Sequence, residues 1–173
     1  MLLKQFHSLG YSVSMPESQS QNDERTLALD HLEWSRQLII ETCSHLTDQQ
    51  ARLKLVASDT TPAGIIRHLI AVEQFWFRYI MTGGVPADDW IDDPDGDPEW
   101  NVDGLSLQAL LDRYRETTHE SNLLIGNVDF DTVAKRESRH GLVNLRWIVL
   151  HMIQENAQHC GHMDILVEQM SAK

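Results

Sequence analysis

The chain has 173 residues, of which 42% are hydrophobic, and it carries a formal net charge of −12. Its length fits one domain and its hydrophobic content supports a core, which excludes a wholly disordered chain. The negative charge excludes nucleic acid and anionic membrane surfaces as general partners, because both would repel it. Two cysteines, no apparent signal peptide and no long apolar run predict a cytoplasmic protein without a disulfide framework or a membrane span.

The N-terminal part is predicted to be a tail followed by a helix. Residues 1–22 are polar and include "PESQSQN", which is typical of a linker, so residues 23–173 are expected to form the domain. A helix is predicted from about Asp23 to His45. The residues that give it a helical period are Leu27, Trp34, Leu38 and Cys43. A short helical turn should follow, with Thr47 or Asp48 as its cap.

A second helix is predicted to start at "TTPAG", with Thr61 as the N-cap and Pro62 at the first helical position. It should run through "IIRHLIAVEQFWFRYIMT" and end at Gly83–Gly84. The aromatic residues of this stretch are more typical of a core than of a pocket. Glu73 lies about 140° around this helix from His68, so the two are not expected to share a ligand.

An acidic loop occupies residues 84–104, with seven carboxylates between Asp88 and Glu99. A calcium loop would need a different glycine position, so we interpret it as a solvated loop. Trp90 and Trp100 are expected to cover the end of the domain and to be candidates for a lid.

Two more helices complete the predicted fold. One covers "SLQALLDRYRETTHESNLLIGN", capped by Ser106 or Asp103, and the last runs from about Val143 to Met170. No alternating run long enough for a sheet is present. Four amphipathic helices of about 20 residues predict an all-α four-helix bundle with two long connections.

Polar residues interrupt the apolar face of the last helix. When the helix is unrolled, Asn156 and His159 fall inside the apolar stripe, Glu155 and His162 lie on its edge, and His151 lies slightly farther out. A buried carboxylate without a partner costs several kcal/mol or takes up a proton. A metal cation would remove that cost, whereas the alternative is a buried hydrogen-bond network without an ion.

The spacing of these residues suits metal binding. Glu155 and His159 are four residues apart and His159 and His162 are three apart, so either pair can face one ion. The best candidate for a third ligand is His68, which shares a face with Ile65 and other apolar residues of the second helix. Imidazole and carboxylate ligands suit Zn, Fe, Ni, Co or Mn, and three protein ligands leave a position open for water or substrate.

With "LRWIVLHMIQENAQHCGHMDILVE" and "IIRHLIAVEQFWF" the chain resembles the DinB/YfiT-like superfamily over residues 24–171. It is most similar to the single-domain actinobacterial branch related to the N-terminal domain of mycothiol-dependent maleylpyruvate isomerases. The resemblance implies an antiparallel bundle with a long crossover between the second and third helices. It also implies a divalent metal, such as Zn, Ni or Fe, held by His68, Glu155 and His159.

The resemblance further implies a thiol S-transferase, in which a metal-bound thiol such as mycothiol or bacillithiol attacks a small electrophile. His162 would then be a catalytic acid/base group or an extra ligand, and the bundle would pair into a homodimer. The alternatives are a metal-dependent hydrolase, a binding module without catalysis and a metal-free bundle. Of the remaining candidates, Cys160 is expected to be a buried free cysteine, His31 a histidine of the core or bundle edge, and Arg146 paired or solvated.

Overall fold

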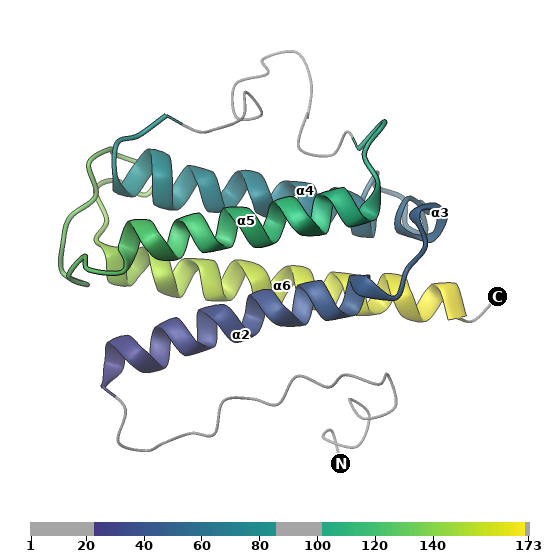
Figure 1. Cartoon of the computed structure of the whole chain (residues 1–173), viewed down its shortest axis with the longest axis horizontal. Coiled ribbons are helices and arrows are strands. Elements are labelled where there is room, and N and C mark those ends of the chain that lie inside the picture. The colour runs from purple at the N-terminus through teal and green to yellow at the C-terminus, as the bar shows by residue number, and fades with distance from the viewer. Residues whose placement is uncertain (1–22, 86–101, 172–173) are drawn as a thin grey trace.

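The computed structural model describes residues 23–85 and 102–171, and its long helices pack lengthwise into a bundle (Figure 1). The elements in chain order are α2 (Glu24–Ser44), α3 (Asp48–Ala51), α4 (Pro62–Glu73), η2 (Gln74–Met81), α5 (Leu107–Ile125) and α6 (Leu145–Ser171). Helical dihedral angles continue across the junction of α4 and η2, which therefore form one rod. The predicted all-α four-helix bundle is confirmed. Within the described ranges, the only β pairing is two isolated bridges in the connection before α6.

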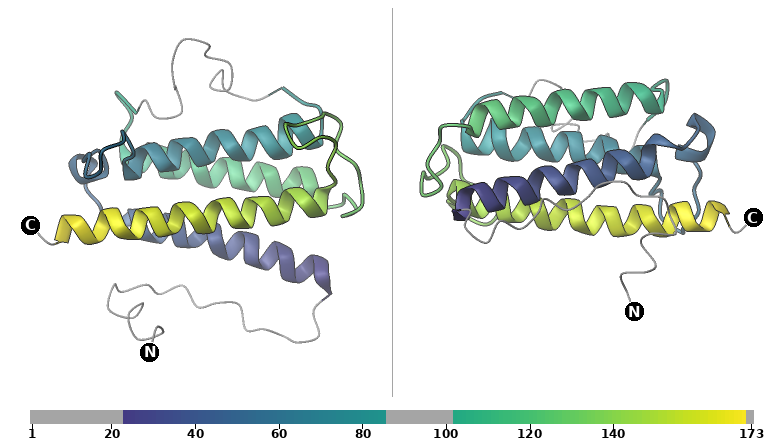
Figure 2. Two further views of the ribbon diagram at one scale, coloured as in Figure 1. Left: turned by 180° about the vertical axis from the view of Figure 1, so that it is seen from behind. Right: turned by 60° about the horizontal axis from the view of Figure 1, so that its bottom comes forward.

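The helices form two pairs, α2 beside α6 and α4 beside α5 (Figures 1 and 2). The helices within a pair are parallel, and the two pairs run in opposite directions. Cys43 near the end of α2 contacts Met163 near the end of α6, so these two helices are parallel. Arg52, before α4, donates to the carbonyl of Val102, before α5, so α4 and α5 start at the same end. The predicted crossover between η2 and α5 therefore has to span the length of the bundle.

Polar side chains define the starts of the helices, as the sequence predicts. Thr61 accepts a hydrogen bond from the Gly64 amide at 3.0 Å, with Pro62 in the first turn. Side-chain oxygens cap three other helices in the same way, and these are Asp23 for α2, Thr47 for α3 and Ser106 for α5. Each cap satisfies an amide that has no partner inside its helix.

The second half of the second helix is a π-helix, which the sequence analysis did not predict. In η2 the backbone bonds span five residues instead of four, a geometry that is rare and usually short. The helix nevertheless ends where expected. Gly83 has a φ of +72°, which glycine adopts without strain, and the Gly84 amide closes the end on the Arg78 carbonyl at 3.0 Å.

The buried face of α2 differs from the predicted one. Leu27 is 43% exposed, whereas Arg36, which the hydrophobic period places outside, is only 1% exposed. The reason is a long-range ion pair, because the Arg36 guanidinium donates to both carboxylate oxygens of Glu73 at 2.8 and 2.9 Å. A paired arginine can occupy a core position that its charge alone would forbid.

The core consists of two apolar clusters with polar side chains between them. The first cluster includes Ile39, Leu69 and Leu110 and lies around the start of α4. The second includes Phe77, Ile125 and Ile148 and lies around η2. The buried polar side chains include Ser35, Arg36, Glu73, Thr117 and Asn156. This polar layer adjoins the part of α4 and α6 that carries the candidate metal ligands.

Some expectations concern residues outside the described ranges. These are the polar tail 1–22, most of the acidic loop 84–104, and the lid candidates Trp90 and Trp100. Among the helices of the described ranges, none combines the length and the apolar character that crossing a bilayer needs.

Candidate metal centre

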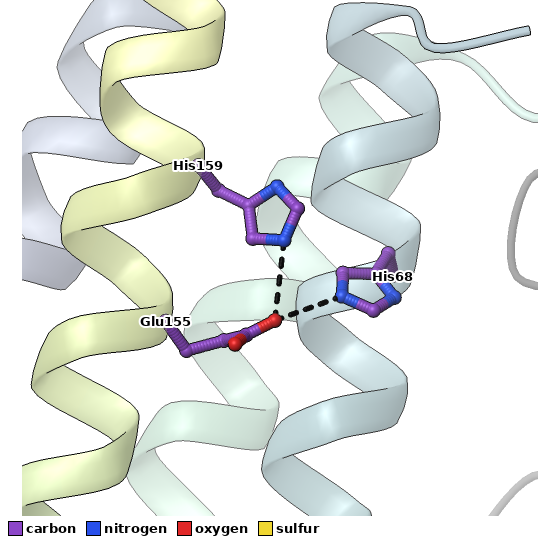
Figure 3. Close-up of side chains that lie close together, drawn as sticks. All are labelled: His68, Glu155 and His159. Atoms are coloured by element: carbon purple, nitrogen blue, oxygen red, sulfur yellow. Dashed lines mark hydrogen bonds and ion pairs between the residues drawn. The ribbon is translucent and has the colours of Figure 1, made fainter. Parts of the chain in front are cut away.

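Three predicted ligands meet between α4 and α6. Glu155 and His159 lie one turn apart on α6, and His68 faces them from α4 (Figure 3). The Nε2 atoms of His68 and His159 each lie 3.2 Å from the same oxygen, Oε1 of Glu155. The imidazole rings have centroids 4.8 Å apart, so they converge rather than point away from one another.

The electrostatics of the group centre on the carboxylate. Glu155 is partly buried, and hydrogen bonds from His159 and then His68 hold its pKa well below its usual value, against the opposing effect of burial. The carboxylate is therefore charged at neutral pH. Both imidazoles direct a ring nitrogen at this charge, and the three groups together offer donor atoms that a cation can bind.

The donor set fits a divalent transition metal. Donor atoms bound at about 2.0–2.1 Å to one tetrahedral ion lie about 3.3 Å from one another. Both nitrogen-to-oxygen distances are 3.2 Å, and all three donor atoms lie within 4.8 Å of one another. Hydrogen bonds to a carboxylate are commonly shorter, about 2.7–2.9 Å for charged donors. These two nitrogen-to-oxygen spacings are thus close to the edge of such a tetrahedron.

Asn156, the other polar residue predicted on the apolar stripe, belongs to the packing of the bundle. Its side chain accepts from the Tyr114 hydroxyl and donates to Ser35 Oγ, both at 3.3 Å. The three residues come from α6, α5 and α2, so this contact fixes the rotation of α6 at the position that follows Glu155. Burial raises the pKa of Tyr114 far above its usual value, which keeps the hydroxyl a donor.

His162 lies apart from the three converging ligands. It is exposed one turn after His159, and the centroids of their rings are 5.4 Å apart in an edge-to-face contact. His162 also lines a separate pocket of about 340 Å³, together with the hydroxyl-bearing Ser58 and Thr60. It is therefore positioned as a neighbour of the centre.

A cleft of about 320 Å³ opens beside the carboxylate, and the sequence analysis missed most of it. It is lined by His68, Ala71, Val72, Phe75, Trp76, Arg139, His151 and Glu155. The aromatic stretch that contains Trp76 is more typical of a core than of a pocket, and no motif or period in the sequence points to Arg139 as a cleft residue. The available signal was His151, which lies one turn before Glu155 on the same side of α6.

The remaining candidates lie elsewhere, as expected. Glu73 pairs with Arg36, and Arg146 pairs with Glu24 and Asp131. His31 makes an edge contact with Trp34, their ring centroids 6.2 Å apart. Cys160 is partly buried, and burial raises the pKa of its thiol to about 12, which argues against a nucleophile.

Comparison with known proteins places these observations in a family. Residues 28–172 match the family described as mycothiol-S-transferase. A conserved protein from Enterococcus faecalis has a similar crystal structure, with a TM-score of 0.68, 12% identity, and coverage of 88% of this chain and 99% of that one. A DinB-like protein from Bacillus cereus ATCC 10987 has a TM-score of 0.60 at 14% identity, with coverage of 83% and 91%. These two likenesses concern the fold. None of the curated proteins compared with the chain matches it.

Proposed function

Because the chain belongs to the mycothiol S-transferase family, we propose that it transfers a low-molecular-weight thiol to a small electrophile. We propose that a divalent metal is held by His68, Glu155 and His159. The observation that supports this most directly is the convergence of two imidazole nitrogens on one carboxylate oxygen beside an open cleft.

The metal, when bound, supplies a Lewis acid that lowers the pKa of a thiol. The chain itself has to orient the two substrates and receive the thiol proton. In the transfer, the S–H bond breaks and a C–S bond forms with the electrophile. In a substitution the electron pair of the broken carbon bond departs with the leaving group. In an addition to a double bond, the electron pair of the π bond moves to the neighbouring carbon, which then takes up a proton.

We assign the proton-accepting role to His162. It is exposed, so it can pass the proton on to water, and its ring contacts that of the ligand His159. Histidine is the side chain that most often serves as a general base. The pocket next to His162 combines the apolar side chains of Val56, Ile165 and Leu166 with the hydroxyls of Ser58 and Thr60, and we propose that it takes the thiol.

The test combines elemental analysis with thiol consumption, using mycothiol and bacillithiol against a panel of electrophiles. The native chain should contain one transition-metal ion and consume thiol. His68→Ala should lose both properties, and His162→Ala should retain the metal and lose turnover. His119→Ala, which removes an exposed histidine of α5, is the matched control.

Protein that contains no stoichiometric metal after expression in metal-replete medium would contradict the proposal. Turnover of an ester or amide without added thiol would instead indicate a hydrolase that uses the same centre.

A further inference from the structure

The cleft beside Glu155 has walls of different character. Val72, Phe75 and Trp76 form an apolar wall on α4 and η2, and His151 and Glu155 form the opposite wall on α6. The volume of about 320 Å³ is at the lower end of the range for small-molecule sites. Because the cleft reaches the candidate ligand Glu155, a molecule bound there would lie next to the metal centre.

The aromatic side chains at this cleft pack against one another. His151 stacks on Trp147 with an interplanar angle of 18° and meets Trp76 edge-to-face at a centroid distance of 4.8 Å. His140 lies 5.1 Å from Trp147 and stacks on Trp76 at 6.3 Å. These four side chains fix one another, so the wall is pre-organised for a planar group with little loss of rotamer freedom.

A cationic group stands at the same cleft. Arg139 lines it, and its Nε donates to His140 Nε2 at 3.1 Å, which connects the guanidinium to the aromatic cluster. Among the described residues Arg139 has no carboxylate partner, although the chain carries a net charge of −12. By contrast, Arg146 in the following helix binds two carboxylates. The guanidinium of Arg139 is therefore available for an anion, which it can bind through two parallel hydrogen bonds.

We propose that this cleft selects electrophiles with a planar aromatic part and a carboxylate, the ring lying against the wall of Val72, Phe75 and Trp76 and the carboxylate on Arg139. This inference rests on the proposed transferase function, which it extends to a class of substrate. The separate pocket at His162 would then take the thiol, and the cleft with its aromatic wall and Arg139 would take the electrophile.

Binding can be tested without turnover. Metal-free protein in chelator is titrated with 2-naphthoate and with neutral 2-naphthamide, and the change in the tryptophan fluorescence of the protein, to which Trp76 and Trp147 contribute, reports occupancy. The acid should bind about tenfold more tightly than the amide, a difference that corresponds to one charge-assisted contact. Arg139→Gln should remove this preference without a change in melting temperature. Arg115→Gln, an exposed arginine of α5 paired with Asp112, should keep it.

In a second experiment, turnover by the metal-loaded protein is measured with a matched pair of aryl chlorides. The substrates are 4-chloro-3,5-dinitrobenzoate and 1-chloro-2,6-dinitrobenzene, which differ in the carboxylate. In each, the thiol sulfur replaces chloride and one proton is released. The acid should have about tenfold higher kcat/KM, and Arg139→Gln should bring the ratio close to one.

Equal affinity for naphthoate and naphthamide, or a preference for the acid that survives in Arg139→Gln, would overturn the inference. A preference in binding without any thiol transfer would support the anion site and refute the transferase function. The two failures are thus separable.

Discussion

Two glutamates on the inner faces of the bundle have different surroundings. Glu73 is fully buried, and both of its oxygens accept from Arg36, whose guanidinium also donates to Asn122 at 2.7 Å. The Glu155 side chain is 21% exposed, and one of its oxygens meets two imidazoles at 3.2 Å beside the cleft. One carboxylate is enclosed by a fixed cation, and the other faces two imidazoles that could bind a metal ion together with it.

The difference shows how the partner decides what a buried carboxylate does. A guanidinium keeps its charge at any accessible pH, so the Glu73 pair is complete and has no position for a further ligand. An imidazole, unlike a guanidinium, has a ring nitrogen that can bind a metal ion, so the two partners of Glu155 are themselves potential ligands. We interpret the Arg36–Glu73 pair as structural and the group around Glu155 as the candidate metal site.

The largest effect on folding is expected at the closed pair. Glu73→Ala leaves the buried Arg36 charge without its partner and should lower the free energy of unfolding by about 3–5 kcal/mol. Urea denaturation measures this. The double variant Arg36→Met, Glu73→Leu should recover most of the loss, because no uncompensated charge remains. A single variant that loses less than about 1 kcal/mol would contradict the structural role.

The next largest effect should depend on metal. Native protein at a free metal concentration of 100 times Kd should gain about 2.7 kcal/mol over the metal-free form, and His159→Ala should gain none. Thermal unfolding with and without chelator, for both proteins, measures the difference. If chelation shifts the melting temperature of both equally, the open group is not the metal site.

A smaller loss of stability is expected at a helix cap that contacts neither Glu73 nor Glu155. Thr61→Ala removes the bond to the Gly64 amide and should cost about 1 kcal/mol of stability. Metal content should not change, because His68 lies nearly two turns further along α4. A loss of metal in this variant would show that the centre depends on the position of the start of α4.

The smallest effect should appear as a dependence on pH in the metal-free protein. The pKa of Glu155 is lowered from its ordinary 4.5 by hydrogen bonds from His159 and His68. A lowered pKa gives stability that is present above pH 4.5 and is lost as the pH falls below it. Glu155→Gln should therefore show a flatter decline below pH 4.5 in thermal unfolding. An equal decline in both proteins would assign the acid sensitivity to other carboxylates.

Local signals in the sequence predicted much of this structure. Thr61 followed by proline is a start signal contained in a few residues, and its effect does not depend on the rest of the fold. The approach of Glu155 and His159 follows from helical spacing alone. His68 could be paired with them because both helices carry these residues on apolar faces, which meet in a bundle.

Other features required contacts that no spacing encodes. Arg36 and Glu73 are 37 positions apart, and each looks like a solvent-facing charge until the helices are packed together. Arg139 reaches the cleft from an irregular connection that has no period to analyse. The hydrophobic period also assumes α geometry, which does not hold in η2.

The widened turns of η2 have a consequence for how specificity can change in this scaffold. Because each turn of a π-helix accommodates an additional residue, the direction of Phe75 and Trp76 relative to His68 depends on the number of residues in the segment as well as on their identity. The loss or gain of a single codon there would change the direction of the Trp76 ring relative to its present neighbours. Insertions and deletions in this rod would thus reshape the cleft while His68, Glu155 and His159 stayed in place.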